Sequence, residues 1–361
     1  MTALTFPAHS IDLAALHARI DEALWDFLDA KTTYADTHGL PEEIPHCLRD
    51  FLDAGGKRLR PLLCVLGWHA ADGHGELGPV VRMAASLELF HAFCLIHDDV
   101  MDGSDTRRGH PTVHRAFTTR ICNRHPSAAA DHLGTHAAIL IGDLTQAWSD
   151  ELLHTAGLTP GQLTAVLPVI DRMRSEVMYG QYLDLLAPLA PVTDLHTALR
   201  VVRYKTAKYT CERPLQTGAV LAGANEPLLE ALSSFALPLG EAFQLRDDLL
   251  GVFGNPNLTG KPVLDDLREG KRTVLLTLAA QHATPPQRAV LDSLVGDRNL
   301  DEDGAARIRT LLEATRARAT VENMITARYE QALTALESAP ISPVVAVALR
   351  RIAALAVERT L

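Results

Sequence analysis

Five charged residues close together in the chain could do chemistry: Asp98, Asp99, Asp102, Arg107 and Arg108. On a helix, Asp98 and Asp102 would stand one turn apart on the same face, with Asp99 beside them. Carboxylates at this spacing repel unless a cation lies between them, and Mg²⁺ prefers carboxylate and phosphate oxygens. Arg107 and Arg108 are suited to holding a phosphate group. The cluster therefore predicts a site for Mg²⁺ and a substrate phosphate, against the alternative of a solvated acidic helix end.

A second acidic cluster, Asp247 and Asp248, ends another apolar stretch. After a break rich in glycine, proline and asparagine, Asp265 and Asp266 follow, with Lys271 shortly behind them. If the two apolar helices lined one cavity, their acidic ends would form two metal-binding walls. A diphosphate would then bridge these walls through several Mg²⁺ ions.

The composition restricts the class of protein. The chain has 361 residues, of which 47% are hydrophobic and 22% charged, as in ordinary globular proteins. Its net charge of −10 argues against general nucleic-acid binding. No apolar stretch is long enough to span a membrane, and the amino terminus lacks the pattern of a signal peptide. The five scattered cysteines indicate reduced thiols, so we expect a soluble, cytoplasmic protein.

Apolar residues recur at helical spacing along most of the chain, and no stretch alternates with the period of a half-buried strand. Glycine, proline and asparagine separate the helical segments. Besides the long helix that carries the first acidic cluster, the expected helices cover residues 12–30, 47–52, 61–71, 137–156, 161–188, 195–223 and 226–250. No linker or repeat divides the chain, so we expect one all-α domain over residues 1–361.

Taken together, these features resemble the trans-isoprenyl diphosphate synthases, also called polyprenyl synthetases. The motifs that carry the resemblance follow that family's order and spacing: GGKRLRP at 55–61, LIHDDVMDGSDTRRG at 95–109, KT at 205–206, FQLRDD at 243–248 and GKPVLDD at 260–266. One DDxxD motif would be a weak indication, but five motifs in order are specific. The resemblance implies a helical bundle around a central cavity, and it covers the amino-terminal helix of residues 1–40 less well.

The resemblance also implies a role for each matching residue. The ligands of Mg²⁺, about three ions per site with Mn²⁺ as a substitute, would be Asp98, Asp99, Asp102, Asp247 and Asp248. The residues that bind the substrate diphosphates would be Lys57, Arg60, His91, Arg107, Arg108 and Lys271; of these, Arg107 resembles the contact to the allylic diphosphate. The groups that flank the breaking C–O bond would be Lys205, Thr206, Gln244 and Lys261. Asp184 is a further candidate for the cavity wall, and Asp105 is interpreted as a turn residue.

The expected reaction is the Mg²⁺-dependent, head-to-tail condensation of isopentenyl diphosphate with an allylic diphosphate (dimethylallyl, geranyl or farnesyl). In this family, bulky residues just before the first acidic motif form the floor on which the growing chain stops. Phe93 and Phe90 occupy such positions, which resembles enzymes that make the C20 product, geranylgeranyl diphosphate. The C15 product, farnesyl diphosphate, is the alternative. The resemblance further implies a homodimer.

One position departs from the family pattern, because Gly251 replaces the third aspartate of the second motif. Either Asp247 suffices for the metal, with Asp248 and Asp265 or Asp266 assisting, or the site is weakened and the chain is a non-catalytic partner subunit. Since the other catalytic positions are intact, we favour a working enzyme. Two other classes fit less well: a terpene cyclase would need an NxxxSxxxE motif, and a metal phosphohydrolase would not need two prenyl substrates.

Overall fold

The computed structural model describes residues 10–124, 130–189, 191–254 and 264–357. In chain order, the elements before residue 190 are α1 (Leu13–Thr37), α2 (Glu43–Asp53), α3 (Leu59–Ala70), α4 (Leu77–Asp102), β1 (Thr106–Arg107), β2 (His110–Pro111), α5 (Val113–Arg124), α6 (Ala130–His154), α7 (Pro160–Leu186) and η1 (Ala187–Leu189). The later elements are α8 (Leu195–Val201), η2 (Val202–Glu212), α9 (Arg213–Leu221), α10 (Glu226–Phe253), α12 (Asp265–Arg268), α13 (Val274–His282), α14 (Pro285–Leu294), α15 (Glu302–Ala314), α16 (Ala317–Ser338) and α17 (Pro343–Val357). The predicted all-α class is confirmed, since the described strands are a single two-residue antiparallel pair.

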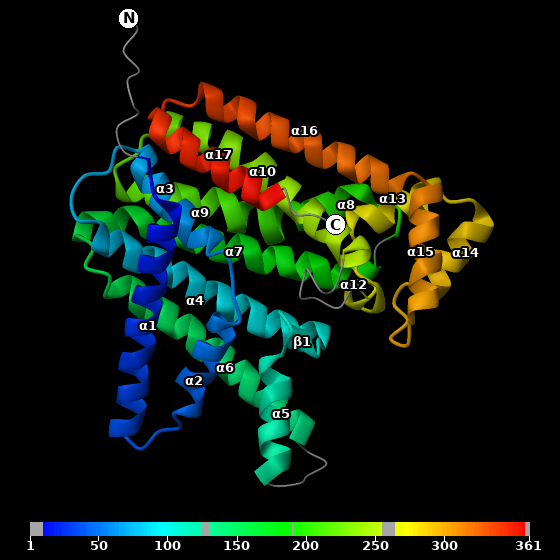
Figure 1. Cartoon of the computed structure of the whole chain (residues 1–361), viewed down its shortest axis with the longest axis horizontal. Helices are drawn as coiled ribbons and strands as arrows, with labels where there is room; N and C mark the ends of the chain where they lie inside the picture. Colours follow the sequence, from blue (N-terminus) through cyan, green and yellow to red (C-terminus); the bar gives the residue numbers. More distant parts are fainter. Residues whose placement is uncertain (1–9, 125–129, 190, 255–263, 358–361) are drawn as a thin grey trace, which may run out of the picture.

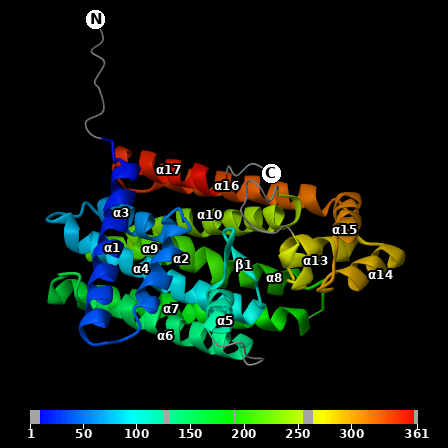
Figure 2. The ribbon, with the colours of Figure 1, turned by 60° about the horizontal axis from the view of Figure 1, so that its bottom comes forward.

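The long helices form layers that run along the molecule (Figures 1 and 2). They succeed one another from α16 and α17 on one side, through α10, to α7 and α6 on the other. The closest packing joins α10 with α16 and η2, α4 with α6, and α3 with α9. The buried apolar side chains form one cluster that extends from α1 to α17.

Helix α4 has the length and apolar composition of a membrane span, but it is a helix of the protein interior. In its most apolar window, 72% of the residues are buried inside the protein. No other helix in the described ranges has this combination of length and hydropathy. The expectation that no apolar stretch is long enough to span a membrane is therefore wrong for α4 by length and composition, although this helix packs in the protein interior.

The acidic end of α4 is fixed by its carboxyl-terminal cap. Gly103 follows Asp102 with a φ of 68°, a left-handed conformation that glycine adopts without strain, and the helix ends there. The chain then turns directly into the β1–β2 hairpin, which carries Arg107. Arg107 is thereby returned to the last turn of α4, beside the aspartates.

The segment expected as one helix over residues 195–223 contains a π-helix, η2, between α8 and α9. Two glycines of neighbouring helices lie against its backbone. A Cβ on Gly180 of α7 would overlap the backbone of Lys205, and a Cβ on Gly240 of α10 would lie 2.5 Å from Cα of Ala207. The π-helix is therefore clamped between α7 and α10, and π-helical turns are typical of functional sites. It carries both Lys205 and Thr206.

Candidate active site

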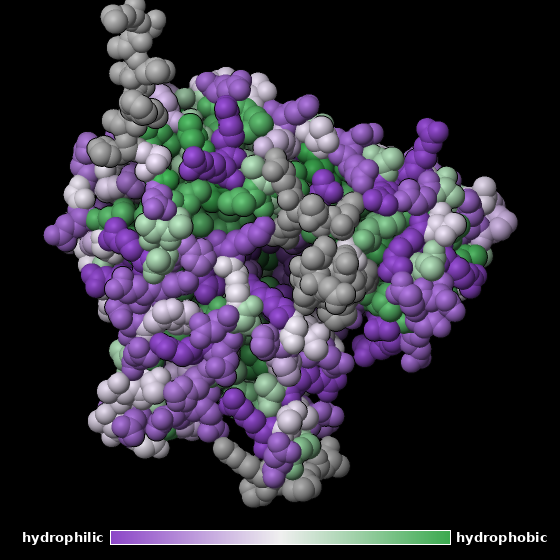
Figure 3. Space-filling model, in the orientation of Figure 1, coloured by the Kyte–Doolittle hydropathy of each residue, from purple (hydrophilic) through white to green (hydrophobic). Residues whose placement is uncertain are grey.

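A cavity of about 1010 Å³ lies between α4, α7, η2 and α10. A hollow rimmed mainly by hydrophilic side chains opens on the face shown in Figure 3. The sequence-predicted residues that line the cavity are Lys57, Arg60, His91, Phe93, Asp98, Arg107, Arg108, Lys205, Thr206, Gln244, Asp247, Asp248 and Lys271. Asp99, Asp102 and Phe90 are not part of its lining. Lys261 lies outside the described residues.

Asp98 is the carboxylate of the first motif on which several polar groups converge. It accepts hydrogen bonds from Gln181 Nε2 at 3.0 Å and Lys205 Nζ at 3.2 Å. Burial raises the pKa of Asp98, but the positive charges of Lys205, Lys271 and Arg107 outweigh burial and bring this pKa down to about 2. The Asp98 carboxylate is therefore ionised at neutral pH and faces the cavity.

Asp99 and Asp102 lie behind this surface. Asp99 is buried, and its Oδ1 accepts a hydrogen bond from Arg107 Nε at 2.8 Å. Asp102 Oδ2 lies 2.9 Å from Lys271 Nζ. Burial raises the pKa of both carboxyl groups, against the effects of Arg107 and Lys271. In this arrangement Asp99 and Asp102 hold cations of the protein, and their role as metal ligands stays a prediction.

The second acidic wall is organised by a hydrogen-bond chain that starts on the π-helix. Thr206 Oγ1 donates to Gln244 Oε1 at 2.5 Å, and Gln244 Nε2 donates to Asp248 Oδ1 at 2.8 Å. Burial, with smaller contributions from nearby carboxylates that include Asp266 and Asp247, raises the pKa of Asp248 to about 7. A bound divalent cation would offset the negative charge of this wall.

The structure gives a physical account of Gly251. A Cβ at this position would overlap the carboxylate of Asp266, which also lines the cavity. Asp266 belongs to α12 and lies 3.5 Å from Lys271 Nζ. A carboxylate from elsewhere in the chain thus occupies the space beside residue 251, and the glycine makes room for it.

A basic region lies at the other end of the polar part of the cavity. The Arg60 guanidinium packs over the ring of Tyr209 at 4.3 Å from its centroid, and Tyr209 Oη lies 3.2 Å from His91 Nδ1. Lys57 Nζ donates to the Leu355 carbonyl of α17 at 2.8 Å. Arg108 has a φ of 54°, and its Nη1 donates a hydrogen bond to the Gly55 carbonyl. Burial and the neighbouring arginines hold the pKa of His91 well below its usual range, so His91 is neutral here.

Sequence reasoning missed Gln181 and Arg58, whereas Asp184, its further candidate for the cavity wall, does line the cavity. Gln181 contacts Asp98, and Asp184 Oδ2 accepts a hydrogen bond from Lys205 Nζ at 2.7 Å. Arg58 is buried and makes ion pairs with Asp21 at 2.8 Å and with Glu88 at 3.1 Å. The spacing of three between Gln181 and Asp184 could have indicated that both side chains lie on one helix face.

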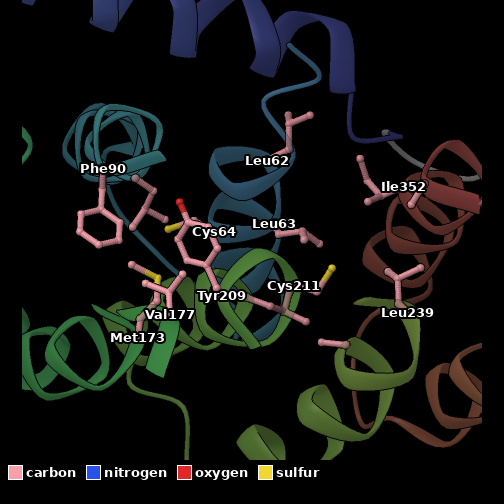
Figure 4. Close-up of a cluster of buried hydrophobic side chains, with 14 of the residues drawn as sticks. Leu62, Leu63, Cys64, Phe90, Met173, Val177, Tyr209, Cys211, Leu239 and Ile352 are labelled. Atoms are coloured by element: carbon pink, nitrogen blue, oxygen red, sulfur yellow. The ribbon is translucent and has the colours of Figure 1, made fainter. Parts of the chain in front are cut away.

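Apolar side chains line the deeper part of the cavity. Phe93 lines it together with Val177 and Met178 of α7. Phe90 lies behind Phe93, with ring centroids 5.3 Å apart, and is fully buried. Figure 4 shows Phe90 on α4 facing Val177 and Met173 of α7, with Tyr209 beside them. The rings therefore form two successive layers, and only the first borders the cavity.

The donor set fits Mg²⁺ that is held jointly by protein and substrate. The described residues contain no group of three acidic, histidine or cysteine side chains close enough to hold a metal ion by themselves. They do place the ionised Asp98 on one wall and Asp247 and Asp248 on another wall of the same cavity. Mg²⁺ is usually bound by one or two carboxylates, with substrate phosphates and water completing its octahedron.

The cavity of this all-α protein combines two acidic walls, a basic region and an apolar pocket. This combination is typical of the class of proteins that act on prenyl diphosphates. The sequence model described as "Polyprenyl synthetase" matches residues 41–312, and the chain belongs to this family of prenyltransferases.

Relatives agree with this assignment. The chain is 32% identical over 287 residues to a geranylfarnesyl diphosphate synthase from Aeropyrum pernix, covering 79% of this chain and 81% of that one. It is 30% identical over 262 residues to a geranylgeranyl diphosphate synthase from Saccharolobus solfataricus, covering 72% and 73%. A crystal structure of geranylgeranyl pyrophosphate synthase from Corynebacterium glutamicum, complexed with isoprenyl diphosphate and magnesium, is similar with a TM-score of 0.93 and 40% identity, covering 97% of this chain and 100% of that one.

Proposed function

We propose that the chain condenses isopentenyl diphosphate head to tail with an allylic diphosphate, releases diphosphate, and makes chiefly geranylgeranyl diphosphate. The observation that carries this proposal is the combination of side chains that line one cavity. Carboxylates, the basic side chains of Lys57, Arg60 and Arg108, and apolar side chains that include Phe93 all border it. Such a cavity suits a substrate with a charged head and an apolar tail.

The residues of the chain have distinct tasks in this reaction. When bound, Mg²⁺ supplies positive charge that stabilises the departing diphosphate. Asp98 and the Asp247–Asp248 wall would hold it, and Arg107 and Lys205, which line the same cavity, would add positive charge near the departing diphosphate. The apolar walls keep water away from the allylic carbocation, so that the isopentenyl double bond attacks it. The departing diphosphate can accept the final proton.

The product length separates this proposal from its alternatives. The A. pernix relative is named for a C25 product, whereas the S. solfataricus relative and the C. glutamicum structure are named for C20 products. The aromatic layer at Phe93 supports C20 for this chain, with C15 as the next candidate. A non-catalytic partner subunit is the remaining alternative, and the argument for it, Gly251, is weakened by the position of Asp266.

The test is to incubate the protein with Mg²⁺, labelled isopentenyl diphosphate and, separately, the C5, C10 and C15 allylic diphosphates, and to size the products. We expect a C20 product that disappears with a chelator. In Phe93→Ala we expect C25 or longer products, because the cavity opens toward Phe90. A mainly C15 product from the wild type would favour the alternative synthase, and no condensation with any primer would favour the partner subunit.

We also propose that the protein is a cytoplasmic homodimer. Exposed apolar side chains gather on α6 and α7, among them Leu140, which is 68% exposed, Tyr179 at 71% and Tyr182 at 59%. Exposed apolar surface favours association when it forms a patch. The five cysteines are free thiols, as expected in a reducing compartment.

Charge on this surface should disrupt the dimer. We expect Leu140→Glu combined with Tyr182→Glu to give a monomer by light scattering at a concentration where the wild type is a dimer. Burying a carboxylate at an apolar interface costs several kcal/mol unless it is paired. The control is Val347→Glu. The Val347 side chain is 49% exposed, and its helix, α17, lies in the layer opposite α6 and α7 (Figure 2). A monomeric wild type would contradict the proposal.

A further inference from the structure

Beyond the apolar part of the cavity lies an ion pair, Arg174–Asp150, that takes no part in the condensation chemistry. Along α7, Asp184, Gln181 and then Met178 with Val177 border the cavity at successive depths. Arg174 comes one turn further along the same helix and is not part of the cavity lining. Its guanidinium lies over the ring of Phe90, 5.3 Å from the ring centroid. Arg174 therefore follows Phe93 and Phe90 in the direction in which a prenyl tail would grow.

Arg174 is paired but not fully satisfied. Its Nη2 donates to Asp150 of α6, so the pair links α6 and α7 beneath the aromatic layer. Its Nε is buried and has no hydrogen-bond partner among the described residues. Both side chains are mostly covered, with exposed fractions of 19% for Arg174 and 34% for Asp150.

We propose that the Arg174–Asp150 pair is a second limit to product length, behind the aromatic floor of Phe93 and Phe90. This inference rests on the proposed function, because it presupposes a tail that grows toward Phe93. An apolar tail gains by burial as long as it displaces water or fills apolar space. Beside Arg174 it would separate a guanidinium from its carboxylate or from water, and an unpaired buried charge is costly. Elongation would therefore stop at this layer.

Arg174 also contacts the second ring of the aromatic floor, that of Phe90. A guanidinium stacked on a ring is attracted to its face, and this contact restrains the Phe90 ring. In the wild type the tail stops at Phe93, so the pair is not reached, and Arg174→Met alone should leave the product at C20. The second limit appears only when the aromatic side chains are removed.

The experiment compares product lengths in a series of variants. We expect Phe93→Ala with Phe90→Ala to make products longer than C20 that end abruptly near C30. Adding Arg174→Met should raise the ratio of C35 and longer products to C30 by about tenfold or more. The reason is that a longer tail would then no longer separate a mostly covered guanidinium from its partner. The matched control is Glu151→Gln in the same double variant, because Glu151 neighbours Asp150 on α6 but pairs with Lys31 of α1. It should not change the ratio.

The outcomes separate the two proposals. If the double variant makes longer products and the triple variant has the same distribution, the second limit is wrong and the aromatic floor stands. If Phe93→Ala and the double variant still stop at C20, both the floor and the second limit are wrong. Arg174→Lys in the double variant keeps a positive charge and should retain the stop near C30. Thermal unfolding is measured for each variant to check that it is folded.

A binding measurement tests the second limit without turnover. Non-hydrolysable prenyl thiodiphosphates of C20 to C40 are titrated into the double and triple variants with Mg²⁺ by calorimetry. We expect affinity to fall beyond C30 in the double variant and beyond a longer tail in the triple variant. Equal length dependence in both variants would overturn the proposal even if the chain were a non-catalytic subunit, an outcome in which the proposed function fails.

Discussion

In Asp98→Ala, the rate of condensation is expected to fall by about 10²–10³-fold, as is usual when a group that organises charge stabilisation is removed. The reason is the convergence of Lys205, Gln181 and Arg107 on this one carboxylate. Removing it deletes a ligand for Mg²⁺ and leaves Lys205 with Asp184 as its remaining close acidic partner. The measurement is the initial rate of labelled isopentenyl diphosphate incorporation over a range of Mg²⁺ concentrations.

Asp105 provides the matched control for Asp98. Asp105 is close to Asp98 in the chain, but its side chain is 72% exposed and pairs with Arg115. Surface ion pairs contribute little, so we expect Asp105→Ala to keep the rate within about a factor of two. Equal activity of Asp98→Ala and the wild type at saturating Mg²⁺ would show that this carboxylate is not part of the site.

The second large effect is expected at Gly251, where restoring the family's usual aspartate should harm the protein. An aspartate at this position would overlap the carboxylate of Asp266. The Asp266 carboxylate is the end of a flexible side chain and can move aside, so the main cost is the repulsion between two carboxylates that share this space. We expect Gly251→Asp to unfold at a lower temperature and to lose activity by about tenfold or more, in a melting experiment and a rate assay.

A pair of exchanges tests whether Asp266 does the work of the missing aspartate. Asp266→Ala alone should weaken Mg²⁺ activation, while Gly251→Asp with Asp266→Ala should recover much of the lost activity, because one carboxylate then occupies the shared space. Asp265→Ala is the control, since Asp265 adjoins Asp266 but is absent from the cavity lining. Full activity of Gly251→Asp with Asp266 in place would refute this interpretation.

The class of fold and most of the site could be predicted from the sequence because both have strong local signals. Helical periodicity and breaking residues located the helices up to α10 except α5, while no range was predicted for α12 to α17. The ordered motifs selected residues that line one cavity. Periodicity could not reveal η2, because a π-helical turn depends on neighbours such as Gly180 and Gly240 that lie far away in the chain. Nor could it place Asp266 beside Gly251, which depends on how α12 packs against α10.

Within the first motif, the sequence treated three aspartates alike, and the structure distinguishes them. Asp98 faces the cavity, whereas Asp99 is buried against Arg107 and Asp102 pairs with Lys271. The difference follows from which face of α4 each residue occupies and from the return of the hairpin after Gly103. Both depend on tertiary packing, which spacing alone does not specify.

The π-helix has a consequence for how this family can vary. In an α-helix each residue turns the chain by about 100°, so the removal of one residue between α8 and α9 would rotate one helix against the other by that amount. Lys205 and Thr206 are therefore positioned by the number of residues in η2 as much as by their own identity. Natural and designed variants should accept changes of side chain in this segment more readily than a change in its length.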